Sequence, residues 1–209
     1  MLSPHSTRPR IPSPTRSCNF LHRPVRQGTA RLLHSRHRQQ ELLVLVAAAL
    51  HDGDIRVRDS LAICETLHER FPEQGLWPAD AVARAVARSV SAEMHAGFGA
   101  LREHMSMNIR ARYPGKGRTP ECLADIERIL AIWTDCRARF GSGDFLFGRF
   151  GIADAMFAPV VLRFQTYGVA LEGAARDYAD AVLALPALQA WVADAEAEAE
   201  RIEKFDLYE

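Results

Sequence analysis

The spacing of apolar residues divides the chain into an unpatterned beginning and a patterned remainder. Residues 1–40 show no hydrophobic period, and prolines interrupt them at positions 4, 9, 12, 14 and 24. Such a segment offers little apolar surface to bury, so we expect irregular backbone there. The pattern changes at Leu42, where the apolar run LLVLV is compatible with a buried strand.

A β-hairpin is predicted directly after this run, between Leu50 and Val57. Asp52-Gly53 supplies the two central residues of a type I′ turn. Ile55 and Val57 then alternate with arginines, which predicts a second strand with one buried face.

One helix and a linker follow the hairpin. Ser60 is a good N-cap for a helix from Leu61 to Arg70, and Pro72 ends that helix. The stretch from Phe71 to Ala79 contains two prolines and a glycine, which is typical of a linker.

The rest of the chain has helical spacing. A long helix is predicted from Ala79 to about Ile109, with a bend at Gly97 and Gly99. Its apolar positions are Val82, Val86, Val90, Phe98, Leu101 and Met105. Thr119 caps the next helix, which has Pro120 at its first position and ends at Gly141. Its predicted buried face consists of Leu123, Ile126, Leu130 and Trp133.

A third bundle helix is predicted from Ile152 to Tyr167, between an N-cap at Gly151 and a stop at Gly168. Asp154 can reach back to the free backbone amides, and Pro159 should kink the helix. Two further helices are predicted over Ala174–Leu185 and Pro186–Ile202, the last with Leu188, Trp191 and Val192 facing inward. We therefore predict a mostly α fold, an all-α bundle of about five helices preceded by a β-hairpin and one helix.

Composition limits the class of protein. Apolar residues make up 48% of the chain and charged residues 25%, which is ordinary for a soluble globular protein. The longest apolar run, Leu42 to Leu50, is half the ~18 residues of a membrane span. The four cysteines, at positions 18, 64, 122 and 136, form no CxxC pair and no metal-ligand spacing, so we expect reduced thiols in a cytoplasmic protein without a metal. His95 and His104 lie nine residues apart, near opposite faces of one helix, and cannot chelate one ion.

The net charge of zero is the sum of a basic first segment and an acidic remainder. Residues 1–40 hold eight arginines and no acid, whereas the remainder holds 18 basic and 26 acidic side chains. Three interpretations fit the basic segment: a nucleic-acid-binding arm, an organelle transit peptide, or a product of out-of-frame translation of GC-rich DNA. No aromatic or helical pattern accompanies the arginines, and the prolines break any amphipathic helix. We favour the third interpretation.

Four groups of short motifs, in this order, resemble the glutathione transferase family. They are Asp59-Ser60-Leu61-Ala62-Ile63 between strand and helix, Phe71-Pro72 with Leu76-Trp77-Pro78 in the linker, Gly148 to Asp154 before the kinked helix, and Leu185-Pro186-Ala187-Leu188 through Trp191 near the end. The runs Met107–Arg110 and Asp154–Pro159 look most like a bacterial branch related to the maleylacetoacetate isomerase type.

The resemblance implies a thioredoxin-like domain that binds glutathione and an all-α domain that shapes the pocket for a small electrophile. Residues 42–72 would then be a partial thioredoxin-like domain and residues 79–209 the all-α domain, while residues 1–41 lie outside the family pattern. The resemblance further implies glutathione as co-substrate and a homodimer. From the residues themselves we expect no metal, nucleic acid or membrane as partner. Candidate pocket residues are Phe98, Met105, Tyr113 and Phe157.

Two segments match the glutathione site of the family. An acid followed by serine receives the γ-glutamyl end: the hydroxyl and the helix-start amides bind its carboxylate, and the acid binds its ammonium. Asp59 and Ser60 match this pair, although Ser60 alone would also be explained as a helix cap and Asp59 as a surface acid. Ala48 and Ala49 stand where the family has a cis-proline loop that contacts the cysteinyl part. A non-proline cis bond costs ~3 kcal/mol, so we expect this loop to lack the usual shape.

The residue that activates the glutathione sulfur is not identified. No β-α-β pattern precedes Leu50, and only Ser17 and Cys18 resemble the Ser or Cys turn of the family. The family pattern begins abruptly after the basic segment, and a shifted reading frame explains both anomalies. The open functions are therefore a glutathione transferase impaired in this chain, a glutathione-dependent cis–trans isomerase, or a non-catalytic helical product.

Overall fold

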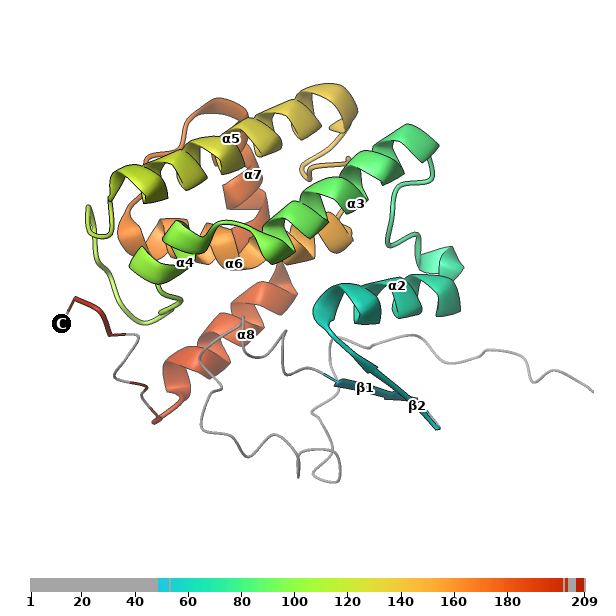
Figure 1. Cartoon of the computed structure of the whole chain (residues 1–209), viewed down its shortest axis with the longest axis horizontal. Coiled ribbons are helices and arrows are strands. Elements are labelled where there is room, and N and C mark those ends of the chain that lie inside the picture. The colour runs from blue at the N-terminus through green and yellow to red at the C-terminus, as the bar shows by residue number, and fades with distance from the viewer. Residues whose placement is uncertain (1–48, 53, 201, 203–205, 209) are drawn as a thin grey trace, which may run out of the picture. The chain divides into compact units, whose positions relative to one another are not determined.

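The computed structural model describes residues 49–52, 54–200, 202 and 206–208. The expectations for residues 1–41, for the LLVLV run, and for Ser17, Cys18 and Ala48 concern residues outside this set. The described residues form helices and one two-stranded antiparallel sheet (Figure 1). The predicted fold class, a helical bundle after a hairpin and one helix, is confirmed.

The hairpin pairs β1 (Ala49–Asp52) with β2 (Ile55–Arg58). Asp52 pairs with Ile55 as the last residue of β1, so the prediction that Asp52 is a central residue of the turn is wrong. The observed register sets Leu50 opposite Val57, and both are half-buried. Ile55, predicted to share the buried face, is 52% exposed.

Helix α2 (Ser60–Arg70) begins one residue earlier than predicted, because Asp59 and not Ser60 is its N-cap. Asp59 Oδ1 accepts hydrogen bonds from the amides of Leu61 at 2.9 Å and Ala62 at 3.3 Å. A carboxylate can satisfy two of the free amides at a helix start, which leaves Ser60 as the first helical residue. The linker that follows contains a short 3-10 turn, η2 (Pro72–Gln74).

The predicted long helix is divided into α3 (Ala81–Ala96) and α4 (Gly99–His104), and it ends five residues before the predicted position. Phe98 between them has φ 60° and a buried side chain. Asp125 accepts from the Leu101 amide at 2.9 Å, and Arg102 donates to the Gly97 carbonyl at 2.9 Å. These two side chains fix the interruption from both sides.

The other helices lie close to their predicted positions. They are α5 (Pro120–Phe140), α6 (Ile152–Tyr167), α7 (Gly173–Leu183) and α8 (Pro186–Ala197). The caps at Thr119 and Gly151 are confirmed, whereas α8 ends before the predicted Ile202. Val82 and Leu123, predicted to be inside, are 60% and 41% exposed. Their helices are rotated relative to the prediction and bury Ala83 and Cys122 instead.

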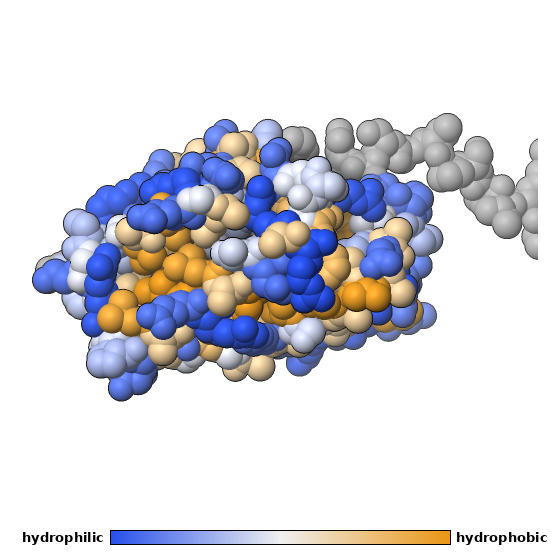
Figure 2. Space-filling model, turned by 90° about the horizontal axis from the view of Figure 1, so that it is seen from above, coloured by the Kyte–Doolittle hydropathy of each residue, from blue (hydrophilic) through white to orange (hydrophobic). Residues whose placement is uncertain are grey.

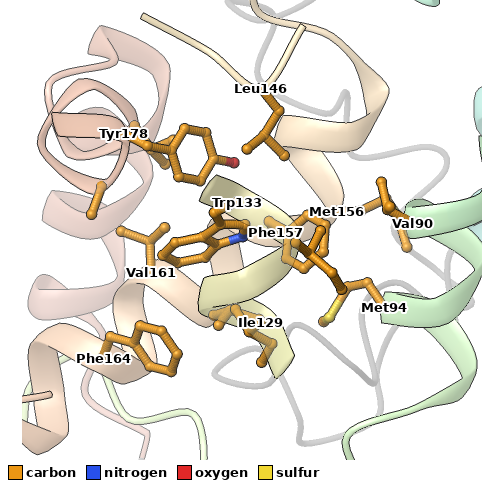
Figure 3. Packing of buried hydrophobic residues seen from close by; sticks show 14 of the residues in the cluster. Val90, Met94, Ile129, Trp133, Leu146, Met156, Phe157, Val161, Phe164 and Tyr178 are labelled. Atoms are coloured by element: carbon orange, nitrogen blue, oxygen red, sulfur yellow. The ribbon is translucent and has the colours of Figure 1, made fainter. Parts of the chain in front are cut away.

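Trp133 of α5 lies at the centre of the core (Figure 3). Its ring packs against Phe157 and Phe164 of α6 at centroid distances of 6.0 and 5.4 Å, and against Tyr178 of α7 at 4.9 Å. Helix α6 is buried along most of its length, so the bundle is built around it. Aromatic rings of this size supply much of the hydrophobic free energy of such a core.

The surface mixes hydrophilic and hydrophobic residues. On the face drawn in Figure 2, a band of hydrophobic residues lies between hydrophilic ones. No helix among the described residues is long and apolar enough to cross a membrane.

Candidate functional site

The candidate site lies at the junction of β2 and α2. Asp59 occupies this junction with φ 78° and ψ 136°, a positive φ that is uncommon for a residue with a side chain. Such conformations cost of the order of 1–3 kcal/mol and persist where the surrounding contacts impose them. Here the two amide hydrogen bonds to Asp59 Oδ1 supply part of that constraint.

A histidine from the bundle completes the site. His95 lies in the last turn of α3, with Nε2 2.9 Å from Asp59 Oδ2 and Nδ1 3.4 Å from Ser60 Oγ. The structure thus joins the predicted pair to a third residue, His95, for which the sequence predicts no role. The contact between positions 59 and 95 arises because α2 packs against α3. No motif spacing in the sequence could have predicted it.

The three side chains differ in their access to solvent. The Asp59 side chain is 45% exposed and that of His95 29%, whereas Ser60 is buried at 2%. The Asp59 carboxylate is therefore accessible from solvent, although Oδ2 already contacts His95. The amides of Leu61 and Ala62 are already bonded to Asp59 itself.

The second predicted glutathione contact is only partly described. Ala49 is exposed and pairs with Arg58 at the start of the hairpin, while Ala48 lies outside the described residues. The roles of Ala48 and Ala49 stay predictions.

The four predicted pocket residues, Phe98, Met105, Tyr113 and Phe157, are all buried in one hydrophobic cluster. None of them lines the small pocket between the linker and the start of α6. That pocket is lined by Gly75, Leu76, Trp77, Pro78, Phe147, Arg149, Phe150, Gly151, Ile152, Ala153 and Asp154. The assignment of the four residues to a substrate pocket stays a prediction.

The described cysteines are poor candidates for sulfur chemistry. Cys64, Cys122 and Cys136 are free thiols, and burial raises the pKa of each to about 11. At neutral pH they are therefore protonated, whereas the thiolate is the reactive form. In the part of the chain that the structure describes, no group of three or more His, Cys, Asp or Glu residues could hold a metal ion.

The described residues thus form a hairpin and a helix that a proline-containing linker joins to a helical bundle, with an acid–serine pair at the start of α2. The sequence family described as the glutathione S-transferase C-terminal domain matches residues 79–194, which is more than half of the chain. This chain belongs to the glutathione S-transferase family.

Solved structures agree with this assignment. The chain resembles a glutathione transferase homolog from Burkholderia gl BGR1, solved with bound glutathione, at 25% identity and a TM-score of 0.53 over 77% of this chain and 78% of that chain. It also resembles maleylacetoacetate isomerase from Anaeromyxobacter dehalogenans 2CP-1, solved with dicarboxyethyl glutathione and citrate, at 27% identity and a TM-score of 0.52 over 74% and 72%. None of the curated proteins matches the chain. The resemblance to a bacterial branch of this type is confirmed.

Proposed function

We propose that this chain is a glutathione transferase in which Asp59 and Ser60 bind the γ-glutamyl end of glutathione, and in which transfer of the thiol is impaired. The observation that carries the proposal is the acid–serine pair at the start of α2, with the Asp59 carboxylate accessible to solvent. The Burkholderia homolog, which aligns over most of the chain, was solved with glutathione.

The chemistry of the pair suits an α-amino acid group. The Asp59 carboxylate attracts the ammonium of the ligand, and the Ser60 hydroxyl at the positive end of α2 attracts its carboxylate. Ser60 is buried and two first-turn amides are bonded to Asp59, so the ligand must displace existing contacts. One charge-assisted contact contributes about 1.5–3 kcal/mol, which is small against the cost of ordering a flexible tripeptide. We expect glutathione to bind at best in the millimolar range.

Conjugation needs a further group that stabilises the glutathione thiolate. In that reaction the sulfur forms a bond to an electrophilic carbon, a leaving group such as halide departs with the bonding electrons, and the thiol proton passes to solvent. The sequence before Leu50 lacks the strand–turn–helix pattern that carries this group in the family. We therefore expect conjugation of an aryl halide no faster than the uncatalysed reaction.

The test compares two variants that lose the same kind of helix cap. Asp59→Ala removes the cap of α2, and Asp80→Ala removes the cap of α3, where Asp80 accepts from the Ala83 amide at 2.8 Å. Each loses about 1 kcal/mol of stability. In calorimetric titrations, glutathione binding should disappear in Asp59→Ala and persist in Asp80→Ala.

Other results contradict different parts of the proposal. Binding that is equal in both variants, or undetectable in the unmodified chain, means that Asp59 does not hold glutathione. Micromolar affinity with clear turnover of the aryl halide means that transfer is not impaired.

A second candidate is glutathione-dependent cis–trans isomerisation, favoured by the 27% identity to a maleylacetoacetate isomerase. There the sulfur adds to a double bond, rotation follows, and elimination regenerates the thiol. Isomerisation of maleylacetoacetate without net loss of glutathione would distinguish it from conjugation.

The family resemblance also leads us to propose a homodimer in the cytoplasm. Light scattering of the purified chain reports the oligomeric state, and fractionation of cells reports the location.

A further inference from the structure

Both ring nitrogens of His95 contact the acid–serine pair. Nε2 lies 2.9 Å from Asp59 Oδ2 and Nδ1 lies 3.4 Å from Ser60 Oγ. An ionised carboxylate only accepts hydrogen bonds, so Nε2 carries the hydrogen in the first contact. The direction of the second contact then depends on whether Nδ1 also carries one.

The charge of the ring decides what Ser60 can do. In the neutral imidazole, Nδ1 is an acceptor, so Ser60 gives it the single hydroxyl hydrogen. In the imidazolium, Nδ1–H donates to Ser60 Oγ, and the hydroxyl hydrogen becomes available to another acceptor. A ligand carboxylate only accepts, so it obtains a hydrogen bond from Ser60 when His95 is protonated.

We propose that His95 is a positioning residue of the γ-glutamyl site, which takes up one proton from solvent when an α-amino-carboxylate binds at Ser60. The inference rests on the proposed function, and it adds that a residue of the all-α domain controls the Ser60 hydroxyl. The ligand carboxylate at Ser60 favours the added positive charge on the neighbouring Nδ1, while the ligand ammonium shares the Asp59 carboxylate with the ring. The bond from Nε2 to Asp59 is the same in both states.

Two charged residues, one at the β2–α2 junction and one on α4, contact His95. Asp59, at the junction of β2 and α2, is the carboxylate that contacts the ring. Arg102 of α4 donates to the His95 main-chain carbonyl at 3.5 Å. Because that contact is to the backbone, it holds the position of the helix end and leaves both ring nitrogens to Asp59 and Ser60.

The first experiment reads the charge of the ring directly. Nitrogen-15 spectra of the histidine rings of the full chain are recorded near neutral pH, with and without saturating glutathione. The neutral His95 ring should carry its hydrogen on Nε2, and glutathione should increase its protonated fraction. His104, on the neighbouring helix α4, serves as internal control and should not respond.

The second experiment removes the proton site and keeps the hydrogen bonds. In His95→Gln, the amide can donate to Asp59 and accept from Ser60, but it cannot gain a proton. Glutathione affinity should fall roughly tenfold, as expected for loss of a charge-assisted bond. The dependence of affinity on pH between about 5 and 8, where histidine changes charge, should flatten. His104→Gln should leave the glutathione affinity and its pH dependence unchanged. Ser60→Ala should abolish the glutathione-linked protonation of His95.

The outcomes separate this inference from the proposed function. Glutathione binding with an unchanged charge on His95, or an unaltered pH profile in His95→Gln, overturns the role of His95 and leaves the Asp59 site standing. Complete absence of binding to the unmodified chain overturns the site and, with it, the role of His95.

Discussion

Among the described residues, two that are not glycine have positive φ values, Asp59 and Phe98. Each is held by contacts from other parts of the chain. Asp59 accepts hydrogen bonds from the start of α2 and contacts His95 of α3, and the Phe98 side chain is buried in the hydrophobic core. At both positions the tertiary contacts impose a conformation that local preference disfavours.

Two glycines in one loop give a matched test of backbone conformation against crowding. Gly115 and Gly117 have φ values of 77° and 72°. A Cβ at Gly117 would lie 2.3 Å from the His104 carbonyl oxygen, whereas one at Gly115 would have nothing within 4 Å. We expect Gly115→Ala to lower the free energy of unfolding by about 1 kcal/mol and Gly117→Ala by roughly 2–4 kcal/mol. Urea denaturation measures both, and equal losses would contradict the crowding argument.

At the scale of elements, α6 depends on one buried carboxylate. Asp154 accepts from the Gly151 amide at 2.8 Å and from the Leu146 amide at 3.1 Å, so it joins the preceding loop to the first turn. Burial raises the pKa of Asp154 to about 6, although the hydrogen bonds from the Leu146 and Gly151 amides oppose the increase. A carboxyl with a raised pKa retains its proton up to a higher pH in the folded state than in the unfolded state.

This difference predicts the pH dependence of stability. Between about pH 4, where an unfolded aspartate titrates, and pH 6, the folded chain holds the extra proton. The contribution of Asp154 to the free energy of unfolding is therefore fully present below about pH 4. It is lost as the pH rises through 6, which lowers the free energy of unfolding by roughly 2–3 kcal/mol. Denaturation at several pH values should show this slope in the unmodified chain.

The matched variant is Asp154→Asn, which cannot titrate. It should be less stable near pH 4, because the amide offers one acceptor oxygen in place of two, and its stability should vary less between pH 4 and 6. An identical slope in both proteins would assign the pH dependence to other groups.

At the scale of the whole molecule, the hairpin and α2 depend on the bundle. Two strands are too few for independent stability. Arg88 of α3 donates to both carboxylate oxygens of Glu65 of α2 at 2.9 Å, and its guanidinium lies 5.7 Å from the Trp77 ring centroid. These hydrogen bonds hold the pKa of the Glu65 carboxyl below its usual value.

Removing the Arg88–Glu65 ion pair should increase local opening of the hairpin and α2 only. Both side chains are more than a third exposed, so the pair contributes less than about 1 kcal/mol. In Arg88→Ala, amide hydrogen exchange over residues 49–70 should accelerate by up to about fivefold, while α5 and α6 stay unchanged. Arg128→Ala removes a similar surface pair with Glu93 at 2.7 Å, which joins α5 to α3, and should not affect residues 49–70. Uniform acceleration along the chain would contradict this coupling.

The sequence by itself determined the features that depend on neighbouring residues. Thr119 and Gly151 cap α5 and α6 as predicted, because capping bonds form within one turn. The short motifs at the joint and in the linker identified the family, which the match over residues 79–194 confirms.

Only the tertiary structure decided the features that depend on residues distant in sequence. The interruption at Phe98 needs Asp125 of α5, and the exposure of Val82 depends on how α3 is rotated against its neighbours. His95 reaches Asp59 and Ser60 because α3 packs on α2, a contact across 35 residues that no local pattern encodes. Hydrophobic periodicity shows that a helix has a buried side, but the partner that covers it, and the polar groups brought together there, are set by packing.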